Sequence, residues 1–590
     1  MPTHRRQPRR IAARLLRDEA AELAFLRPHP DHQSNGEELE HRDPKGRLSF
    51  IANYSKGLPH NNLGEVNQLA YRQLLTAFQS ESPDRFERIT LGTPSGVDLT
   101  NPQAGLAFDL EGSDAQAVTI PAAPRIDEAE NSAEMGELYW MALARDVNFR
   151  EYGTGANTDA AGRTQAAAAS LSEPPLANAE FSAFRGPKVG NAVTAAVTPG
   201  NPPIQPTLFR GFTAGDLVGP YISQFLVKGT APPIPDAGFI QYGTLQINQR
   251  QRTVMAPAGG GADFLTNFLR WRGVQDGRHV FGGNDILGSD IFDPQRRFIR
   301  NLRDLANYVH FDALYEAHLN ACLLLLAMPA RFDPGNPYVD SRTQDGFGTF
   351  GPPHILTLVT EVATRALKAV WFQKWGVHRR LRPEEFGGRI HVHRNVAAGR
   401  YPMIDGEILA SGVIPLIEAA FGGAALLPQV FPEGAPTHPA YGAGHATVAG
   451  ACVTILKAWF DESEVFDPNV VAPPSPPNPA LLARLRENRR PKVPNLDGEP
   501  AAGTPSGTVL IDYVPPANET SLTVGGELNK LAANIALGRN AAGVHWRSDY
   551  TESLRLGEEI AVRLLQEQKQ TYSEDQYLSF TTFDGRAIAI

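Results

Sequence analysis

The chain has 590 residues, of which 42% are hydrophobic and 20% are charged, and its net charge at pH 7 is -9. This composition is typical of a soluble globular protein with a large core. The acidic balance argues against a general nucleic-acid binder, because an acidic surface repels phosphate backbones. The two cysteines, Cys322 and Cys452, lie in apolar helical sequence, so we expect buried thiols and neither a disulfide framework nor a Cys-rich zinc site.

The first 23 residues are basic and contain no apolar segment before their acidic residues. They therefore do not resemble a secretory signal and are predicted to begin a helix. The most apolar run, residues 321–330, is too short to span a bilayer. We therefore expect a soluble protein without a membrane partner, cytoplasmic by default.

Two irregular stretches interrupt a mainly helical chain. Residues 151–205 are rich in Ala, Gly, Pro, Thr and Asn, which predicts a long excursion. Residues 465–520 include five prolines between positions 473 and 479, which favour an insertion loop because proline cannot continue a helix or a central strand. Apolar residues at every third or fourth position predict helices over 304–327, 354–375, 445–460, 525–543 and 550–570. Residues 243–256 predict a small peripheral hairpin.

A local charge reversal is the first chemical signal. Residues 374–400 contain seven Lys and Arg against two Glu, although the whole chain is acidic. Lys374 continues the apolar face of the preceding predicted helix and is therefore expected to point inward. Pro383 favours an extended Arg382, which can return its guanidinium toward the same place. Buried cations need an anion partner. A solvated basic patch or a nucleic-acid contact is the alternative for this segment.

Two further segments carry histidines at helix ends. In residues 438–459, Gly444 and His445 begin a predicted helix whose first amides have no internal partner, which makes an anion cradle beside a group that exchanges protons. A simple change of chain direction is the alternative. In residues 538–550, His545 and Asp549 are four apart, so the carboxylate can orient a metal-ligating imidazole if the segment is helical. A structural His–Asp pair is the alternative there.

Taken together, Lys374-x7-Arg382-Pro, Gly444-His445 and Arg539-x5-His545-x3-Asp549 resemble the family that unites vanadium-dependent haloperoxidases with certain acid phosphatases. Seven residues between Lys374 and Arg382, and His438 seven before His445, are similar to the red-algal and cyanobacterial bromoperoxidases. The resemblance covers most of the chain. It implies a mainly α fold with two four-helix bundles and small hairpins. Residues 1–300 would then form an N-terminal helical and oligomerisation half, and 301–590 a catalytic bundle.

The resemblance also implies a cofactor, substrates and an assembly. Vanadate(V) would bind with His545 as the single protein ligand to vanadium, and hydrogen peroxide would oxidise bromide, iodide or chloride to a hypohalous acid that halogenates an electron-rich organic substrate. A large homo-oligomer, a dodecamer by analogy, is expected. Residues 341–351 are expected to supply oxygens to a structural divalent cation such as calcium.

Each site residue carries an implied role. The oxyanion would be held by four groups: Lys374, Arg382, Arg539 and the amide of Gly444. His445 is the implied acid/base, with His438 and Lys374 beside it in the catalytic set. Trp371 and His438 would tune the halide, and Asp549 would orient His545.

One position departs from the family pattern. The turn normally contains Ser-Gly-His, whose hydroxyl binds a vanadate oxygen, but here the residue is Ala443. Two other functions remain open, the second of them because of Ala443. A phosphomonoesterase would use His545 as nucleophile and His445 as the leaving-group acid. A non-catalytic oxyanion-binding assembly protein would use the same cradle without turnover.

Overall fold

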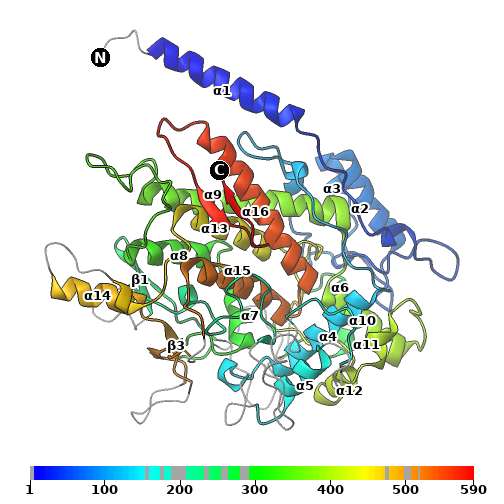
Figure 1. Cartoon of the computed structure of the whole chain (residues 1–590). Coiled ribbons are helices and arrows are strands. Elements are labelled where there is room, and N and C mark those ends of the chain that lie inside the picture. The colour runs from blue at the N-terminus through cyan, green and yellow to red at the C-terminus, as the bar shows by residue number, and fades with distance from the viewer. Residues whose placement is uncertain are drawn as a thin grey trace.

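The computed structural model describes residues 6–152, 159–172, 179–187, 207–230, 238–253, 263–279, 292–471, 478–496, 506–515 and 519–590. These residues form a mainly helical body with a few short hairpins, which confirms the predicted fold class (Figure 1). Much of the predicted excursion at 151–205, and parts of the insertion at 465–520, lie outside the described residues. No helix in the described part of the chain is long and apolar enough to cross a membrane.

The N-terminal half contains helices separated by long irregular segments. Their bounds are α1 Arg6–Leu26, α2 Gln68–Ser80, α3 Pro83–Phe86, α4 Ala129–Ala144, α5 Arg163–Ser170 and α6 Phe268–Gln275. Within α4, every residue from Asn131 to Ala144 is buried. A hairpin pairs β1 (Phe239–Tyr242) antiparallel with β2 (Leu245–Asn248), so it begins before the segment 243–256 in which it was predicted.

The C-terminal half contains the longer helices of the body. Their bounds are α7 Leu302–Phe311, α8 Glu316–Ala327, α9 Pro352–Phe372, α10 Pro383–His391, α11 Gly406–Ala410, α12 Val413–Ala420, α13 Gly444–Trp459, α14 Pro479–Arg489, α15 Val524–Ala541 and α16 Arg547–Lys569. Two more antiparallel hairpins pair β3 (Lys492–Pro494) with β4 (Leu510–Asp512) and β5 (Ser579–Thr581) with β6 (Ala587–Ala589).

Helix α13 is the central helix of the C-terminal half. Helices α9, α15 and α16 pack around it, and all its residues except His445 are buried. Its backbone lies almost directly against that of α16. A Cβ at Gly557 would lie 2.1 Å from the carbonyl oxygen of Thr447, and one at Gly450 would lie 2.2 Å from that of Leu554. The glycines therefore permit a contact that fixes the start of α13 relative to α16.

One hydrophobic core serves both halves of the chain. Its buried residues run from Ile51 to Phe583 and include most of the apolar residues of α4, α9, α13, α15 and α16. Helix α4 also contacts α11, α12 and α15. Residues on both sides of the predicted boundary near residue 300 belong to this core. The division of the chain at that point stays a prediction.

The helix predicted over 304–327 is interrupted. Asp312 has an extended backbone (φ -70, ψ 149) and ends α7, and the Glu316 side chain accepts from the amide of Ala313 before α8 begins. The apolar periodicity continues through the break and therefore did not reveal it. The interruption matters for the site, because it frees the Asp312 carboxylate to reach a distant side chain.

Helix α9 changes its winding where the predicted site begins. The α-helix ends at Phe372 and a π-helix runs over Gln373–His378, closed by Arg379 at φ 41. π-Helical turns inside longer helices occur frequently at functional sites. Lys374 is the second residue of this turn and is fully buried, as its place on the apolar face predicted.

Candidate functional site

The predicted site residues converge on one cavity of about 420 Å³. Its lining includes Trp371, His438, Gly444, His445, Arg539 and His545. Lys374 and Arg382 are 0% exposed and lie behind this lining, Lys374 next to Trp371 and Arg382 next to His438 and His545. Arg382 Nη1 is 2.9 Å from His545 Nε2, although the two residues are far apart in sequence. Four separate chain segments therefore bring their polar ends to the same place.

Lys374 is held by carbonyl groups. Its Nζ donates to the carbonyl oxygens of Pro439 (2.8 Å) and Ala440 (3.0 Å). Burial holds the pKa of Lys374 well below its ordinary value, and the charge of Arg382 lowers it further. The site without a ligand thus disfavours the charged form of Lys374, and a bound anion would stabilise it.

Arg382 has the extended backbone that Pro383 favours, with φ -77 and ψ 152. Its guanidinium donates to the carbonyl oxygens of His438 (2.9 Å) and Val544 (2.7 Å). Nη2 also lies 2.8 Å from Nδ1 of His438. Burial lowers the pKa of Arg382 to about 10. The side chain links the histidine turn to the start of α16.

His545 is fixed as a neutral imidazole by its two neighbours. Its Nδ1 lies 2.7 Å from Asp549 Oδ2, and its Nε2 faces Arg382, which can only donate. Nδ1 therefore carries the proton and Nε2 presents a lone pair to the cavity wall. Burial holds the pKa of His545 well below its ordinary value, and the charges of Arg382 and Lys374 lower it further. A neutral imidazole with one oriented lone pair is suited to bind a metal.

The contact between His545 and Asp549 does not need His545 to be helical. Helix α16 begins at Arg547, and Asp549 also accepts from the amide of Trp546 at 3.1 Å, so its carboxylate closes the first turn of the helix. Arg380 Nη1 donates to the other oxygen of Asp549 at 3.0 Å. Burial raises the pKa of Asp549 to about 6, against the charge of Arg380.

Arg539 comes from the last turn of α15. Its Nη1 donates to the carbonyl oxygen of Val309 at 2.9 Å, and its guanidinium lies over the Phe431 ring at 5.5 Å. Its buried Nε has no hydrogen-bond partner within the described residues. Burial lowers the pKa of Arg539 to about 10. An unpartnered buried donor is costly unless a ligand satisfies it.

The charge balance of the site differs from that of the surrounding core. Several other buried cations in the described structure have carboxylate partners within 3.0 Å: Lys56 pairs with Glu384, Arg380 with Glu134 and Asp549, and Arg547 with Glu137. Three others, Arg210, Arg389 and Lys457, bond to carbonyl or amide oxygens instead. The site differs because its three cations gather around one residue, His545, whose pKa all three lower. In the same described ranges, Lys374, Arg382 and Arg539 form no ion pair with a carboxylate. Buried charges need compensation, so the site is complete only with an anion.

The start of α13 supplies the backbone part of the cradle. Gly444 is its first residue and Ala443 is its N-cap, without a side-chain hydrogen bond to the helix amides. The amide of Ala443 itself donates to Ser553 Oγ at 2.8 Å. A Cβ at Gly444 would lie 3.2 Å from the Trp371 ring, so glycine lets the indole approach the helix terminus. Gly444 lines the cavity, and the first amides of an α-helix have no partner inside the helix, so this turn can bind an anion.

His445 is paired with the residue that interrupts the predicted long helix. Its Nε2 lies 3.0 Å from Asp312 Oδ1. Burial lowers the pKa of His445, whereas the charge and hydrogen bond of Asp312 raise it. The imidazole is half-buried at the cavity surface, so it can exchange a proton with a bound ligand.

His438 and Trp371 form the aromatic side of the cavity. Their ring centroids are 4.8 Å apart, and the Trp371 Nε1 donates to the Thr100 carbonyl oxygen at 3.1 Å. Lys374 Nζ lies 5.6 Å from the Trp371 ring centroid. Burial holds the pKa of His438 well below its ordinary value, and the charge of Lys374 lowers it further. The Trp371 indole and the neutral His438 imidazole thus shield the cations from water.

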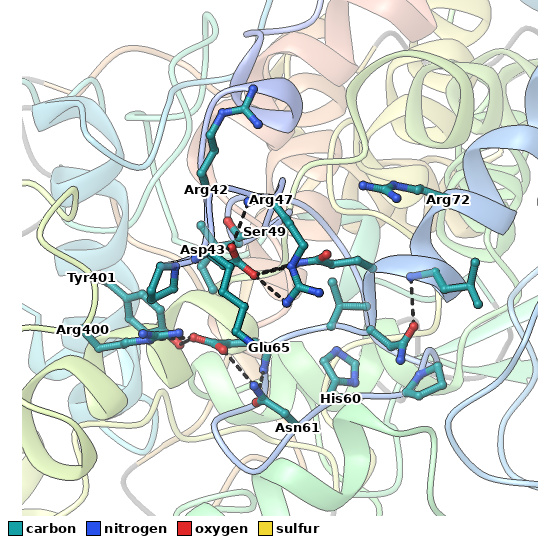
Figure 2. A pocket seen from close by; sticks show the side chains of 18 of the residues that line it. Arg42, Asp43, Arg47, Ser49, His60, Asn61, Glu65, Arg72, Arg400 and Tyr401 are labelled. Carbon is teal, nitrogen blue, oxygen red and sulfur yellow. Dashed lines mark hydrogen bonds and ion pairs between the residues drawn. The ribbon is translucent and has the colours of Figure 1, made fainter.

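A larger cavity of about 960 Å³ lies elsewhere on the molecule (Figure 2). It is also basic, but Asp43 accepts from Arg47 at 2.9 Å and Glu65 accepts from Arg400 at 2.9 Å. Its unpaired cations are exposed. Water and these carboxylates satisfy its charge, so this cavity lacks the demand for an anion that marks the site at Arg382.

Two residues of the site lay outside the sequence-based prediction. Asp312 orients His445, and Arg380 holds Asp549. Arg380 was counted in the basic run without a role, and Asp312 was part of a predicted continuous helix. Both contacts join segments more than a hundred residues apart, and no local spacing signals them.

Within the described residues, no group of three or more His, Cys, Asp or Glu side chains is placed to hold a metal ion. Residues 341–351, expected to bind a divalent cation, contain one such side chain, Asp345. A calcium site there stays a prediction. An oxyanion held by cations and one imidazole needs no such group.

Comparison with known proteins decides the family. The chain is 38% identical to the vanadium-dependent bromoperoxidase of Corallina officinalis, over 100% of both chains. The chain belongs to the vanadium-dependent bromoperoxidase family. It is also 38% identical to the protein of that name from Corallina pilulifera, again over 100% of both chains. The protein of that name from Ascophyllum nodosum is 32% identical over 92% of this chain and 87% of its own.

The structural comparisons agree with membership of the bromoperoxidase family. The sequence model for the second helical-bundle domain of VCPO matches residues 355–574, which span α9 to α16. The homohexameric structure of the second vanadate-dependent bromoperoxidase from Ascophyllum nodosum covers 99% of this chain and 91% of its own, with a TM-score of 0.78 at 26% identity.

We predict that the site binds inorganic phosphate or sulfate when vanadate is absent, because its donors suit a tetrahedral oxyanion. Arg539→Gln removes a charge-assisted donor and should weaken phosphate binding roughly ten- to hundred-fold, since such bonds contribute about 1.5–3 kcal/mol. Isothermal titration with phosphate measures this. Arg47→Gln, in the cavity of Figure 2, is the matched control and should leave the affinity unchanged. Equal affinities of wild type and Arg539→Gln would contradict the assignment of the cradle.

Proposed function

We propose that this chain uses bound vanadate and hydrogen peroxide to oxidise bromide to hypobromous acid, which halogenates electron-rich organic compounds. Iodide is an easier substrate of the same reaction and chloride a harder one. The observation that carries the proposal is the set of three buried cations without carboxylate partners around a neutral, oriented His545. Phosphate would satisfy the cations, but the Nε2 lone pair of His545, oriented by the contact of Nδ1 with Asp549, suits a metal-centred oxyanion.

The residues fit vanadate, whose vanadium(V) centre would activate peroxide as an electrophile without changing its own oxidation state. His545 Nε2 is the proposed ligand to the metal. Lys374, Arg382, Arg539 and the amide of Gly444 would hold the oxygens. These donors are already in place, so they stabilise developing negative charge without reorganisation.

His445 is the proposed proton carrier. Asp312 lies at its Nε2, orients the ring and offsets the positive charge of the protonated form, so the other ring nitrogen, Nδ1, is the one that would exchange protons with peroxide and with the departing oxygen. His438 and Trp371 exclude water and shape the halide position. Exclusion of water strengthens the interaction of the buried cations with the ligand.

Three finer points belong to the same proposal. We propose a homo-oligomer, supported by the homohexameric relative, with the dodecamer a prediction that light scattering tests. We also propose that residues 341–351 bind calcium, in which case a chelator should lower the stability of the protein. We further propose a cytoplasmic location, which cell fractionation tests.

The deciding experiment compares bromination by apo-protein with and without added orthovanadate, in the presence of hydrogen peroxide and bromide. We expect bromination only with vanadate and competitive suppression by phosphate, because both anions need the same donors. Hydrolysis of p-nitrophenyl phosphate without bromination would support a phosphomonoesterase instead. If the protein binds vanadate but shows neither activity, the result would support the non-catalytic assembly role. His545→Ala should abolish bromination while the circular dichroism spectrum is retained.

A serine at the N-cap of α13 should improve the site. In Ala443→Ser, the hydroxyl can accept from a helix amide and donate its proton to the oxyanion, which contributes about 1 kcal/mol. We expect vanadate affinity or turnover to rise several-fold in a titration followed by steady-state bromination. Ala443→Gly is the control, because it improves capping without adding a hydroxyl. The same gain in both variants would assign the effect to the helix rather than to the ligand.

Trp371 should influence chloride more than bromide. Its indole covers Lys374 and packs beside His438, so Trp371→Arg admits water and a further charge where the most demanding oxidation occurs. Steady-state rates with each halide should show a larger relative loss for chloride. Trp371→Phe is the control that keeps an aromatic ring. Equal losses for both halides would make Trp371 structural, and chloride turnover above bromide turnover would overturn the bromoperoxidase proposal.

A further inference from the structure

Asp312, the partner of His445, uses only one of its two carboxylate oxygens in that contact. Its Oδ1 lies 3.0 Å from Nε2 of His445. Its Oδ2 is buried and has no hydrogen-bond partner within the described residues. A buried carboxylate oxygen without a donor is costly, because it has lost its water and gained nothing in exchange. The second oxygen of Asp312 therefore needs a donor of its own.

His318, in the first turn of α8, is a second buried side chain without partners. It is 0% exposed, and both of its ring nitrogens lack a hydrogen-bond partner in the part of the chain that the structure describes. Burial lowers the pKa of His318 to about 4, although the charge of Asp312 raises it. The ring is therefore neutral at pH 7 and offers one N–H donor. A leucine would fill this place without an unsatisfied polar group, so packing alone does not account for the imidazole.

Tyr308, one turn before Asp312 on α7, adds a third group of the same kind. Its hydroxyl is buried and unpartnered among the described residues. Burial raises the pKa of Tyr308, and the charges of Glu316 and Asp312 raise it further. Asp312 is thus close enough to act on both Tyr308 and His318, yet the described structure contains no direct hydrogen bond among the three. Such an arrangement suits a buried water, which needs two to four polar partners.

The other charged groups around Asp312 favour its ionised form. Burial alone would raise the pKa of Asp312, but the charge and hydrogen bond of His445 lower it. The charge of Arg539 lowers it further. Glu316 opposes this effect, because two nearby carboxylates repel each other. Asp312 remains an anion in this balance, and an anion accepts strongly from a donor at Oδ2.

We propose that His318 is a positioning residue for the pair of Asp312 and His445, and that it acts through a buried water. The N–H group of His318 and the hydroxyl of Tyr308 donate to the water, and the water donates to Oδ2 of Asp312. Asp312 is then kept ionised, with Oδ1 directed at Nε2 of His445. Helix α8 contacts α13, which carries His445, so the relay stays within one packed unit.

This inference rests on the proposed function, in which His445 exchanges protons during turnover. Bromide, hydrogen peroxide and one proton give hypobromous acid and water, so every cycle consumes a proton that the acid/base pair has to supply. An ionised Asp312 stabilises the protonated form of His445 that supplies it. His318 would therefore influence the proton-dependent step without touching the ligand.

Substitution of His318 tests this role in the full-length protein with vanadate. His318→Phe keeps a ring of similar size but removes both nitrogens, so Asp312 loses a donor and takes up its proton at higher pH. We expect kcat for bromination to fall roughly tenfold and the acidic limb of its pH profile to move up by about one unit, with KM for bromide unchanged. His318→Gln keeps an N–H donor and should retain the acidic limb of the wild type.

Cys322→Ala is the matched control, because Cys322 is also fully buried and lies one turn further along the same face of α8. It disturbs the packing of that face without removing a polar partner, so kcat and the pH profile should stay as in the wild type. Equal losses in Cys322→Ala, His318→Phe and His318→Gln would assign the effect to packing and overturn the inference. An unchanged acidic limb in His318→Phe would overturn it as well.

A crystal structure of the protein without vanadate supplies a readout that does not depend on turnover. We expect a water within hydrogen-bond distance of both Asp312 Oδ2 and a ring nitrogen of His318, and loss of that water or rotation of the Asp312 carboxylate in His318→Phe. Wild-type crystals in which no water joins the two side chains would contradict the relay. If the water is present but the wild type does not brominate with vanadate, the proposed function fails and the relay stands.

Discussion

Burial of cationic side chains without carboxylate partners is the constraint on which this site depends. Lys374 and Arg382 are fully buried and Arg539 nearly so, and each is held by backbone carbonyl groups rather than by acids. Removing charges from water is costly, and carbonyl dipoles offset only part of that cost. The fold tolerates this arrangement because the surrounding core is extensive. The uncompensated positive charge therefore favours the binding of an oxyanion.

The scaffold delivers these groups from helix ends, where the backbone is free to bind a ligand. The close contact of α13 with α16 fixes Gly444 relative to the segment that carries His545. The π-helical turn after α9 places Lys374 beneath the histidine turn. Rigid packing at these points supplies the preorganisation that electrostatic catalysis needs, because the donors do not have to move when charge develops.

Local chemistry made much of the site predictable. Lys374 followed from the apolar face of a helix, Arg382 from the proline after it, and the His545–Asp549 contact from a four-residue spacing. The alternative of a solvated basic patch is wrong for Lys374 and Arg382, which are fully buried. Asp312 and Arg380 were not predictable, because their partners lie on distant segments that only the tertiary fold brings together.

The ion pairs of Arg380 behind His545 show how the same core compensates its other buried charges. Arg380 is shared between Asp549 and Glu134, so this inner network contains more negative than positive groups, next to a cavity wall with the opposite excess. Burial still raises the pKa of Asp549 to about 6, so keeping it ionised at neutral pH costs the folded state stability. That cost has a function. An ionised Asp549 holds the proton on Nδ1 of His545, and only this tautomer puts the lone pair on Nε2, which accepts from Arg382 here and would bind the metal of a vanadate.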